Sequence, residues 1–118
     1  MRATRTVRGE IVLPEGVPAD EPAYIRVQVE DVSRADAPSE VIGEWRRDVD
    51  RLGDLRFVPF EVTVPTERID ERRLYSVRAH VAFRATGEIA DGDFLSMQSY
   101  PVLTRGYGHD ARVQVRRV

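Results

Sequence analysis

Apolar and polar residues alternate along most of this chain with a period of two, which is the pattern of half-buried β-strands. The clearest alternation runs from position 75 to position 84 and predicts a strand there, entered by a charged turn and left by a glycine-containing loop. Its predicted apolar face is formed by Tyr75, Val77, Ala79, Val81 and Phe83, and its predicted solvent face by Ser76, Arg78, His80 and Arg84.

The same alternation predicts further short strands, at residues 5–13, 23–32, 40–49, 58–64, 94–99, 100–104 and 111–118. In the strand at 40–49, Trp45 and Ile42 compete for the inward face, so the pattern leaves its orientation open. Pro59 cannot donate a hydrogen bond to a neighbour, which predicts an edge position or a bulge for the strand at 58–64. Residues 65–73 are too few for a stable helix and predict a single helical turn.

Strands of this number and length predict an all-β fold with little or no helix. We expect an antiparallel β-sandwich of seven or eight strands, immunoglobulin-like or transthyretin-like. A length of 118 residues fits one domain over residues 1–118. Asp70 lies shortly before Tyr75, a spacing typical of a tyrosine corner, in which the tyrosine hydroxyl bonds back to the preceding connection.

Charge and composition narrow the possible partners. The chain has 18 basic residues and 20 acidic ones, for a net charge of -2, so no net field attracts nucleic acid. Its lack of cysteine excludes disulfides, thiolate metal sites and a cysteine nucleophile. No apolar run approaches the roughly 18 residues of a membrane span, so we expect no membrane insertion by this chain. The chain as given indicates a cytoplasmic protein, or one of the cell envelope if an export segment was removed.

Candidate chemistry is sparse. The spacing of His80 and His109 matches no metal signature, and both are expected to be exposed to solvent. The acidic turn with Asp48, Asp50 and Asp54 lacks the glycine and the terminal glutamate of a calcium loop. No Gly-x-Ser-x-Gly nucleophile elbow is present, and we predict no catalytic, metal-binding or cofactor-binding residue. An enzyme is therefore the least favoured class.

Four segments of the chain resemble the YbaY/YscW family: residues 25–42, 57–60, 69–79 and 100–106. The most specific pieces are Asp31-Val-Ser-Arg-Ala-Asp-Ala-Pro38 and Tyr100-Pro-Val-Leu-Thr104. The resemblance implies a small β-sandwich, usually exported and lipid-anchored, although this sequence has no cysteine to carry a lipid. Some members are pilotins, small chaperones that escort the secretin ring of a type III secretion system to the outer membrane. The family supplies no catalytic motif.

These two specific segments have a structural and a functional interpretation. The first could be a recognition loop, because binding residues often lie on loops. The interpretation we favour is structural: polar side chains satisfy the backbone of a turn, a proline stiffens its exit, and a second proline marks a change of sheet. The residues concerned are Asp31, Ser33, Asp36, Pro38, Tyr100 and Pro101.

A protein-binding surface is the remaining possibility. Aromatic residues and methionine in the less regular segments would be anchors of an interface if exposed, or would close the ends of the sandwich if buried. We hypothesise a non-enzymatic, chaperone-like domain that binds another protein through a sheet face or an unpaired edge strand. The alternative is a structural module that self-associates into a homo-oligomer and binds no small molecule. The candidate anchors are Tyr24, Trp45, Phe94, Leu95, Met97 and Tyr107.

Overall fold

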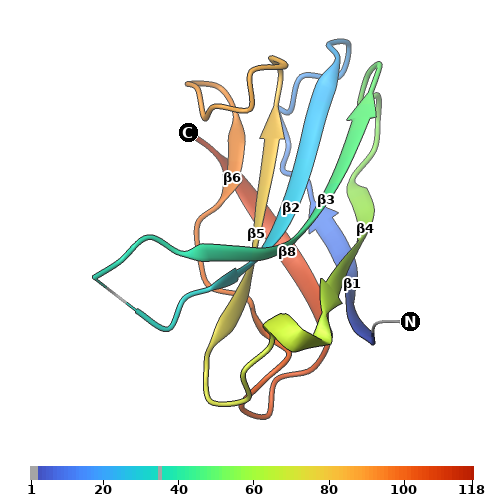
Figure 1. The fold of residues 1–118 in the computed structure, drawn as a ribbon. Helices are drawn as coiled ribbons and strands as arrows, with labels where there is room; N and C mark the ends of the chain where they lie inside the picture. Colours follow the sequence, from blue (N-terminus) through green and yellow to red (C-terminus); the bar gives the residue numbers. More distant parts are fainter. Residues whose placement is uncertain (1–2, 35) are drawn as a thin grey trace.

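Eight strands and a single turn of 3₁₀ helix make up the computed structural model, which describes residues 3–34 and 36–118 (Figure 1). The all-β fold with almost no helix is confirmed. The helical turn, Thr66–Arg68, lies within the segment predicted for it. The strands are β1 Thr4–Val12, β2 Ala23–Asp31, β3 Glu40–Val49, β4 Phe57–Pro65, β5 Tyr75–Ala82, β6 Phe94–Ser96, β7 Pro101–Val102 and β8 Asp110–Arg117.

The strands form one sheet that curls into a nearly closed barrel. Their order is β3-β2-β5-β6-β8-β1-β4, with the short β7 paired to β5. β8 pairs with β6 on one side and with β1 on the other, and it therefore joins what would be the two layers of a sandwich. A sandwich of separate sheets is for this reason not confirmed. The pairing of β1 with β8 is parallel, so the sheet is also not purely antiparallel as predicted.

Inward-facing side chains fill the barrel as the alternation predicts. In β4, Val58, Phe60, Val62 and Val64 are buried while the residues between them are exposed. At the crossing of β1 and β8 the two backbones approach so closely that a Cβ on Gly9 would lie 1.7 Å from the carbonyl oxygen of Ala111. Only glycine fits this position, which explains a glycine on the inward face of β1.

A β-bulge in β3 explains the ambiguous pattern of that strand. Val29 of β2 pairs with Gly43 and Glu30 with Val41, which leaves Ile42 as an extra residue in β3. The extra residue reverses the alternation, so both Ile42 and Trp45 face inward although their numbers differ in parity.

The turn before β5 is held by Tyr75 as the spacing predicts. The Tyr75 hydroxyl accepts a hydrogen bond from the Asp70 backbone N–H at 2.8 Å and donates one to the Arg68 carbonyl at 3.3 Å. The side chain is almost completely buried. These two bonds fix the path by which the chain leaves the helical turn and enters β5.

Candidate protein-binding surface

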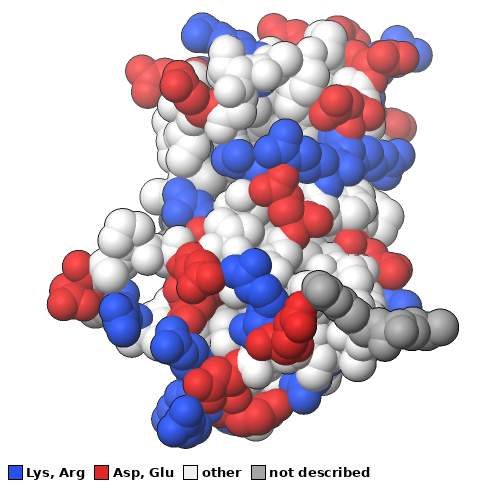
Figure 2. Space-filling model, in the orientation of Figure 1, with Lys and Arg blue, Asp and Glu red and all other residues white. Residues whose placement is uncertain are grey.

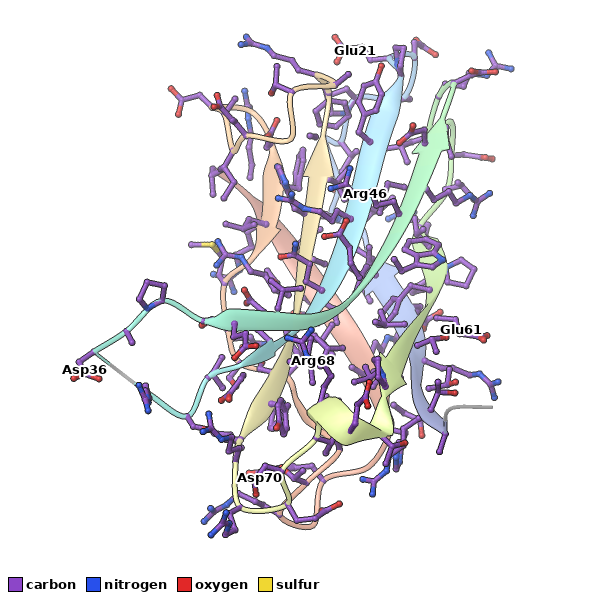
Figure 3. All side chains as sticks on the ribbon, viewed as in Figure 1. Glu21, Asp36, Arg46, Glu61, Arg68 and Asp70 are labelled. Carbon is purple, nitrogen blue, oxygen red and sulfur yellow. The ribbon has the colours of Figure 1, made fainter. Side chains whose placement is uncertain are left out.

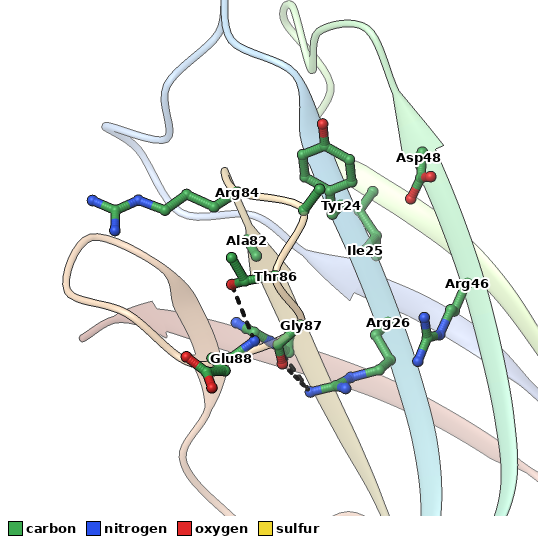
Figure 4. A pocket seen from close by; sticks show the side chains of 12 residues that line it. Tyr24, Ile25, Arg26, Arg46, Asp48, Ala82, Arg84, Thr86, Gly87 and Glu88 are labelled. Carbon is green, nitrogen blue, oxygen red and sulfur yellow. Dashed lines mark hydrogen bonds between the residues drawn. The ribbon is translucent and has the colours of Figure 1, made fainter.

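A hollow of about 530 Å³ lies on the outer face of β2, β3 and β5. Neighbouring strands place Arg46, Arg26 and His80 side by side, because Arg26 is the register partner of both other residues. Tyr24 lies on β2 two residues before Arg26. The connection from Arg84 to Glu88 forms the opposite wall of the hollow (Figure 4). A band of arginine side chains crosses this face in Figure 2, at the height where Figure 3 labels Arg46.

His80 is buried, so its predicted exposure is wrong. The residue does point to the outer face of β5, but the connection between β5 and β6 folds back over that face and covers it. Nε2 of His80 lies 2.8 Å from Oδ2 of Asp93, and both side chains are only about 5% exposed. The same carboxylate oxygen accepts the Ala90 backbone N–H at 3.0 Å. The pair therefore ties the loop to the sheet. His109, by contrast, is exposed as predicted.

Both ring nitrogens of His80 are engaged. Nε2 donates to Asp93, and Nδ1 lies 3.4 Å from Nη2 of Arg26, which can only donate. With the proton on Nε2, Nδ1 is the acceptor for Arg26, so neither ring nitrogen is free. A general base needs a free nitrogen facing the substrate. Here a guanidinium occupies that position, so the geometry is that of a loop anchor.

The charges around the hollow are unevenly paired. Arg46 forms an ion pair with Glu44, which also accepts a hydrogen bond from Gln28 at 2.8 Å. Burial alone would raise the pKa of Glu44, but the hydrogen bonds from Gln28 and Arg46 outweigh it and lower the pKa below its usual value. Among the described residues, Arg26 forms hydrogen bonds to His80 at 3.4 Å and to the carbonyl of Gly87 at 3.3 Å, and its charge also contributes to lowering the pKa of Glu44.

The second feature of the surface is the pair of strands at which the sheet ends, β3 and β4. A Cβ on Gly43 would lie 3.0 Å from methyl groups of Val62 and Val64, so the two strands pack together there without a backbone ladder. Arg68 ties their ends by donating to Glu40 at 2.7 Å and to the Val41 carbonyl at 3.4 Å. The edge position predicted for the strand with Pro59 is confirmed.

The hydrogen bonds between β4 and β1 show which backbone groups of β4 point away from β1, at the edge where the sheet ends. The bonds from Leu13 N–H to the Arg56 carbonyl and from Thr66 N–H to the Ala3 carbonyl assign the even positions of β4 to β1. The odd positions, 57 to 65, therefore point away from β1. Pro59 and Pro65 are both odd, so this edge lacks two of its possible donors. β3 contains no proline.

The six candidate anchors do not form one surface. Phe94 is buried and packs edge-on against Phe83, so it cannot contact a partner in this conformation. Trp45 is partly buried against Phe60, with ring centroids 6.4 Å apart, at the opening between β3 and β4. Tyr24 lines the hollow. Leu95 is half-buried and pairs with His80, whereas Met97 and Tyr107 are 62% and 48% exposed.

The family-like segments meet at one end of the barrel. Asp31 accepts the Ser33 backbone N–H at 3.0 Å and pairs with Arg73 at 2.8 Å, and the Ser33 hydroxyl accepts the Leu74 N–H at 2.9 Å. Burial would raise the pKa of Asp31, but these hydrogen bonds and the charge of Arg73 lower it. Thr104 donates its hydroxyl to the Arg73 carbonyl. This geometry supports the structural interpretation of Asp31 and Ser33.

The other residues of these segments have either a place beside the sheet or an exposed position in a loop. The Tyr100 backbone N–H donates to Ser76 Oγ at 2.9 Å, and Pro101 pairs with Ser76 in the register of β7 and β5. These contacts place Pro101 in the sheet and hold Tyr100 directly before β7. Asp36 and Pro38 are exposed and lie in the connection between β2 and β3, which projects from the barrel with Asp36 near its tip (Figure 3).

The hollow could not be predicted from the spacing of residues along the sequence. Arg26 and His80 come from strands far apart in sequence, and only the pairing of β2 with β5 brings them together. Within residues 3–34 and 36–118, no three His, Asp or Glu side chains converge as metal ligands would. The same part of the chain has no helix long and apolar enough to cross a membrane.

Fold and surface together define a small barrel-like β-domain with an arginine-lined hollow on its outer face. The sequence matches, over residues 2–115, the family described as "Type III secretion system lipoprotein chaperone (YscW)". The chain therefore belongs to this family, which is a chaperone class and not an enzyme class.

A solved structure shares the fold. The chain is similar to a protein described as an alternative pilotin from the type II secretion system of Vibrio cholerae, with a TM-score of 0.79 and 22% sequence identity. The similarity covers 98% of each chain. At this identity it shows a common fold. No curated protein matches the sequence significantly.

Proposed function

We propose that this chain is a pilotin-like chaperone, which binds a subunit of a bacterial secretion system and catalyses no reaction. The observation that carries the proposal is membership of the YscW family over almost the whole chain. The similarity in fold to a protein described as a type II pilotin supports it, because both descriptions concern secretion systems. The partner that these descriptions suggest is a secretin-type subunit.

Two features of the surface support protein binding. The hollow on β2, β3 and β5 combines charged side chains with the ring of Tyr24, a mixture common at interfaces. The edge of β3 offers backbone groups that an extended segment could pair with. The non-enzymatic part of the proposal is supported by His80, whose two nitrogens are both occupied.

The proposal is tested with the purified chain and synthetic peptides that together cover the secretin subunits encoded in the same genome. Trp45, the only tryptophan, lies on β3 beside Arg46 and serves as an intrinsic fluorescence probe. We expect one segment to bind saturably, and its scrambled version not to bind. If no segment binds and secretin assembly in cells is unchanged by deleting the gene, the proposal is wrong.

A structural, self-associating module is the alternative, and the unpaired edges of β3 and β4 favour it. Self-association by edge pairing would raise the apparent mass with concentration. Sedimentation that shows a monomer over about two decades of concentration would exclude this alternative. A concentration-dependent dimer that peptides do not dissociate would support it.

A further inference from the structure

Arg26 and Arg46 form an unusual pair on the outer face of the sheet. They are register partners on β2 and β3, so their side chains leave the sheet next to one another. Like charges directly opposite on neighbouring strands destabilise a sheet. In Figure 4 both side chains border the same hollow. Two like charges that lower stability at a concave surface indicate a binding site for a ligand of opposite charge.

Ion pairing among the described residues neutralises this charge only in part. Arg46 is matched by Glu44. Across the described part of the chain, no carboxylate lies within ion-pair distance of Arg26, whose hydrogen-bond partners are the His80 imidazole and a carbonyl oxygen, although its charge contributes to lowering the pKa of Glu44. Arg84, also at the hollow, is exposed and has no ion pair among the described residues. The hollow thus contains one half-buried guanidinium that forms no direct ion pair with a described residue.

The donors of Arg26 are held in place and only partly used. Both recorded bonds of its side chain come from Nη2, to His80 and to Gly87. A guanidinium has five N–H donors in a planar fork, and the remaining ones fit the two oxygens of a carboxylate. Because β5 and the covering loop fix the guanidinium, little side-chain entropy would be lost when a ligand binds.

We propose that this hollow binds a carboxylate side chain of an acidic peptide segment, with Arg26 as the main ligand and Arg46 as the second. The proposal rests on the proposed function, since the segment would belong to the partner protein. Asp48 and Glu88 also line the hollow and would repel a dense polyanion such as nucleic acid. The ring of Tyr24 offers an apolar contact beside the carboxylate site. A volume of about 530 Å³ accommodates a few side chains.

The test is a titration of the whole chain with a fluorescently labelled peptide of alternating glutamate and alanine, followed by anisotropy at low salt. The matched peptide has glutamine in place of glutamate. We expect the glutamate peptide to bind and the glutamine peptide not to bind. Arg26→Gln should weaken binding about tenfold or more, and Arg46→Gln about threefold, because a charge-assisted bond is lost in each case.

Arg8→Gln is the matched control variant. Arg8 and Arg46 have equal side-chain exposure, 67%, and each pairs with one glutamate, but Arg8 lies on β1 outside the hollow. Its replacement should leave binding unchanged. Since Arg26 is half-buried, the folding of each variant is checked by urea denaturation, and Arg46→Gln tests the site with an exposed residue in case Arg26→Gln is unstable.

Equal effects of the Arg46 and Arg8 replacements would overturn the proposal. So would displacement of the peptide by inorganic phosphate at equal concentration, or binding to phosphatidylglycerol vesicles that depends on Arg26, since the site would then serve small anions or a lipid surface. If a secretin segment binds while the glutamate peptide does not, this inference fails and the proposed function stands. If the glutamate peptide binds and no secretin segment does, the proposed function fails instead.

Discussion

Nε2 of His80 and Oδ2 of Asp93 lie 2.8 Å apart beneath the loop that connects β5 to β6, and both side chains are almost completely buried. The contact joins the outer face of β5 to the residue before β6. Because Asp93 also accepts the Ala90 N–H, a single carboxylate holds both the loop and the histidine. The wall of the hollow therefore depends on this pair.

Replacing Asp93 with alanine should detach the loop while leaving the barrel folded. The change leaves the His80 N–H and the Ala90 N–H without an acceptor, which predicts a loss of about 2 to 3 kcal/mol in the free energy of unfolding. Hydrogen exchange should accelerate at Ala90 and in residues 84–92 more than in β5. Asp91→Ala is the control, because Asp91 is exposed in the same loop. Equal stability of the two variants would show that the buried contact contributes nothing.

Much of the fold could be predicted from alternation because the longer strands, such as β2, β4 and β8, keep one face in the core. β5 shows both the strength and the limit of such a pattern. Its inward residues from Tyr75 to Val81 are all buried as predicted. Ser76 and His80 on the predicted solvent face are buried as well, so their predicted exposure is wrong, because the connections that cover them have positions that no local pattern encodes.

Two other differences between the predicted and the observed fold also arise from contacts between residues far apart in sequence. Parallel pairing of β1 with β8 joins residues from opposite ends of the chain, so strand patterns could suggest two layers but not the strand that joins them. The bulge at Ile42 appears in the sequence only as a conflict between two faces, which register with β2 resolves. The hollow needs three strands in register, which explains why sequence analysis did not find Arg26 and Arg46 as a site.

Tyr75→Phe tests the corner before β5. The variant keeps the buried ring but loses the hydroxyl that accepts from Asp70 and donates to Arg68. We expect the free energy of unfolding to fall by about 0.5–1.5 kcal/mol, measured by urea denaturation, and peptide binding at the hollow to be unchanged. Tyr107→Phe serves as the control because Tyr107 is largely exposed. A Tyr75 variant of unchanged stability would mean that the corner does not hold the turn.

Gly9→Ala tests the contact between β1 and β8. The new Cβ would meet the Ala111 carbonyl oxygen at 1.7 Å and the Phe60 ring at 2.9 Å, so β8 would have to move. We expect a loss of about 3 kcal/mol or more, since backbone atoms cannot yield as a flexible side chain can. Gly108→Ala, where a Cβ would meet nothing within 4 Å, should change stability by less than about 0.5 kcal/mol. Similar melting temperatures for the two variants would disprove the close approach.

The ion pair of Asp31 with Arg73 predicts a dependence of stability on pH. The pKa of Asp31 is lower in the folded protein than the ordinary value of 3.8. Its carboxylate therefore stabilises the fold fully above about pH 4, and this contribution is lost as the pH falls through the folded-state pKa. Asp31→Asn should be less stable than the unmodified chain at pH 7, and the difference should shrink below pH 4. A difference that stays constant from pH 7 to about pH 2 would contradict a lowered pKa.

Pro59 lies on the edge of β4 that faces away from β1, and it removes a donor from that edge. If the proline protects the edge, Pro59→Val should restore the N–H and promote pairing between copies of the chain. Sedimentation velocity should then show a concentration-dependent dimer for the variant at concentrations where the unmodified chain is a monomer. Pro22→Val, in the exposed loop before β2, should not associate. A monomeric Pro59 variant would mean that packing of β3 against β4, at Gly43 and through Arg68, already closes the edge without the proline.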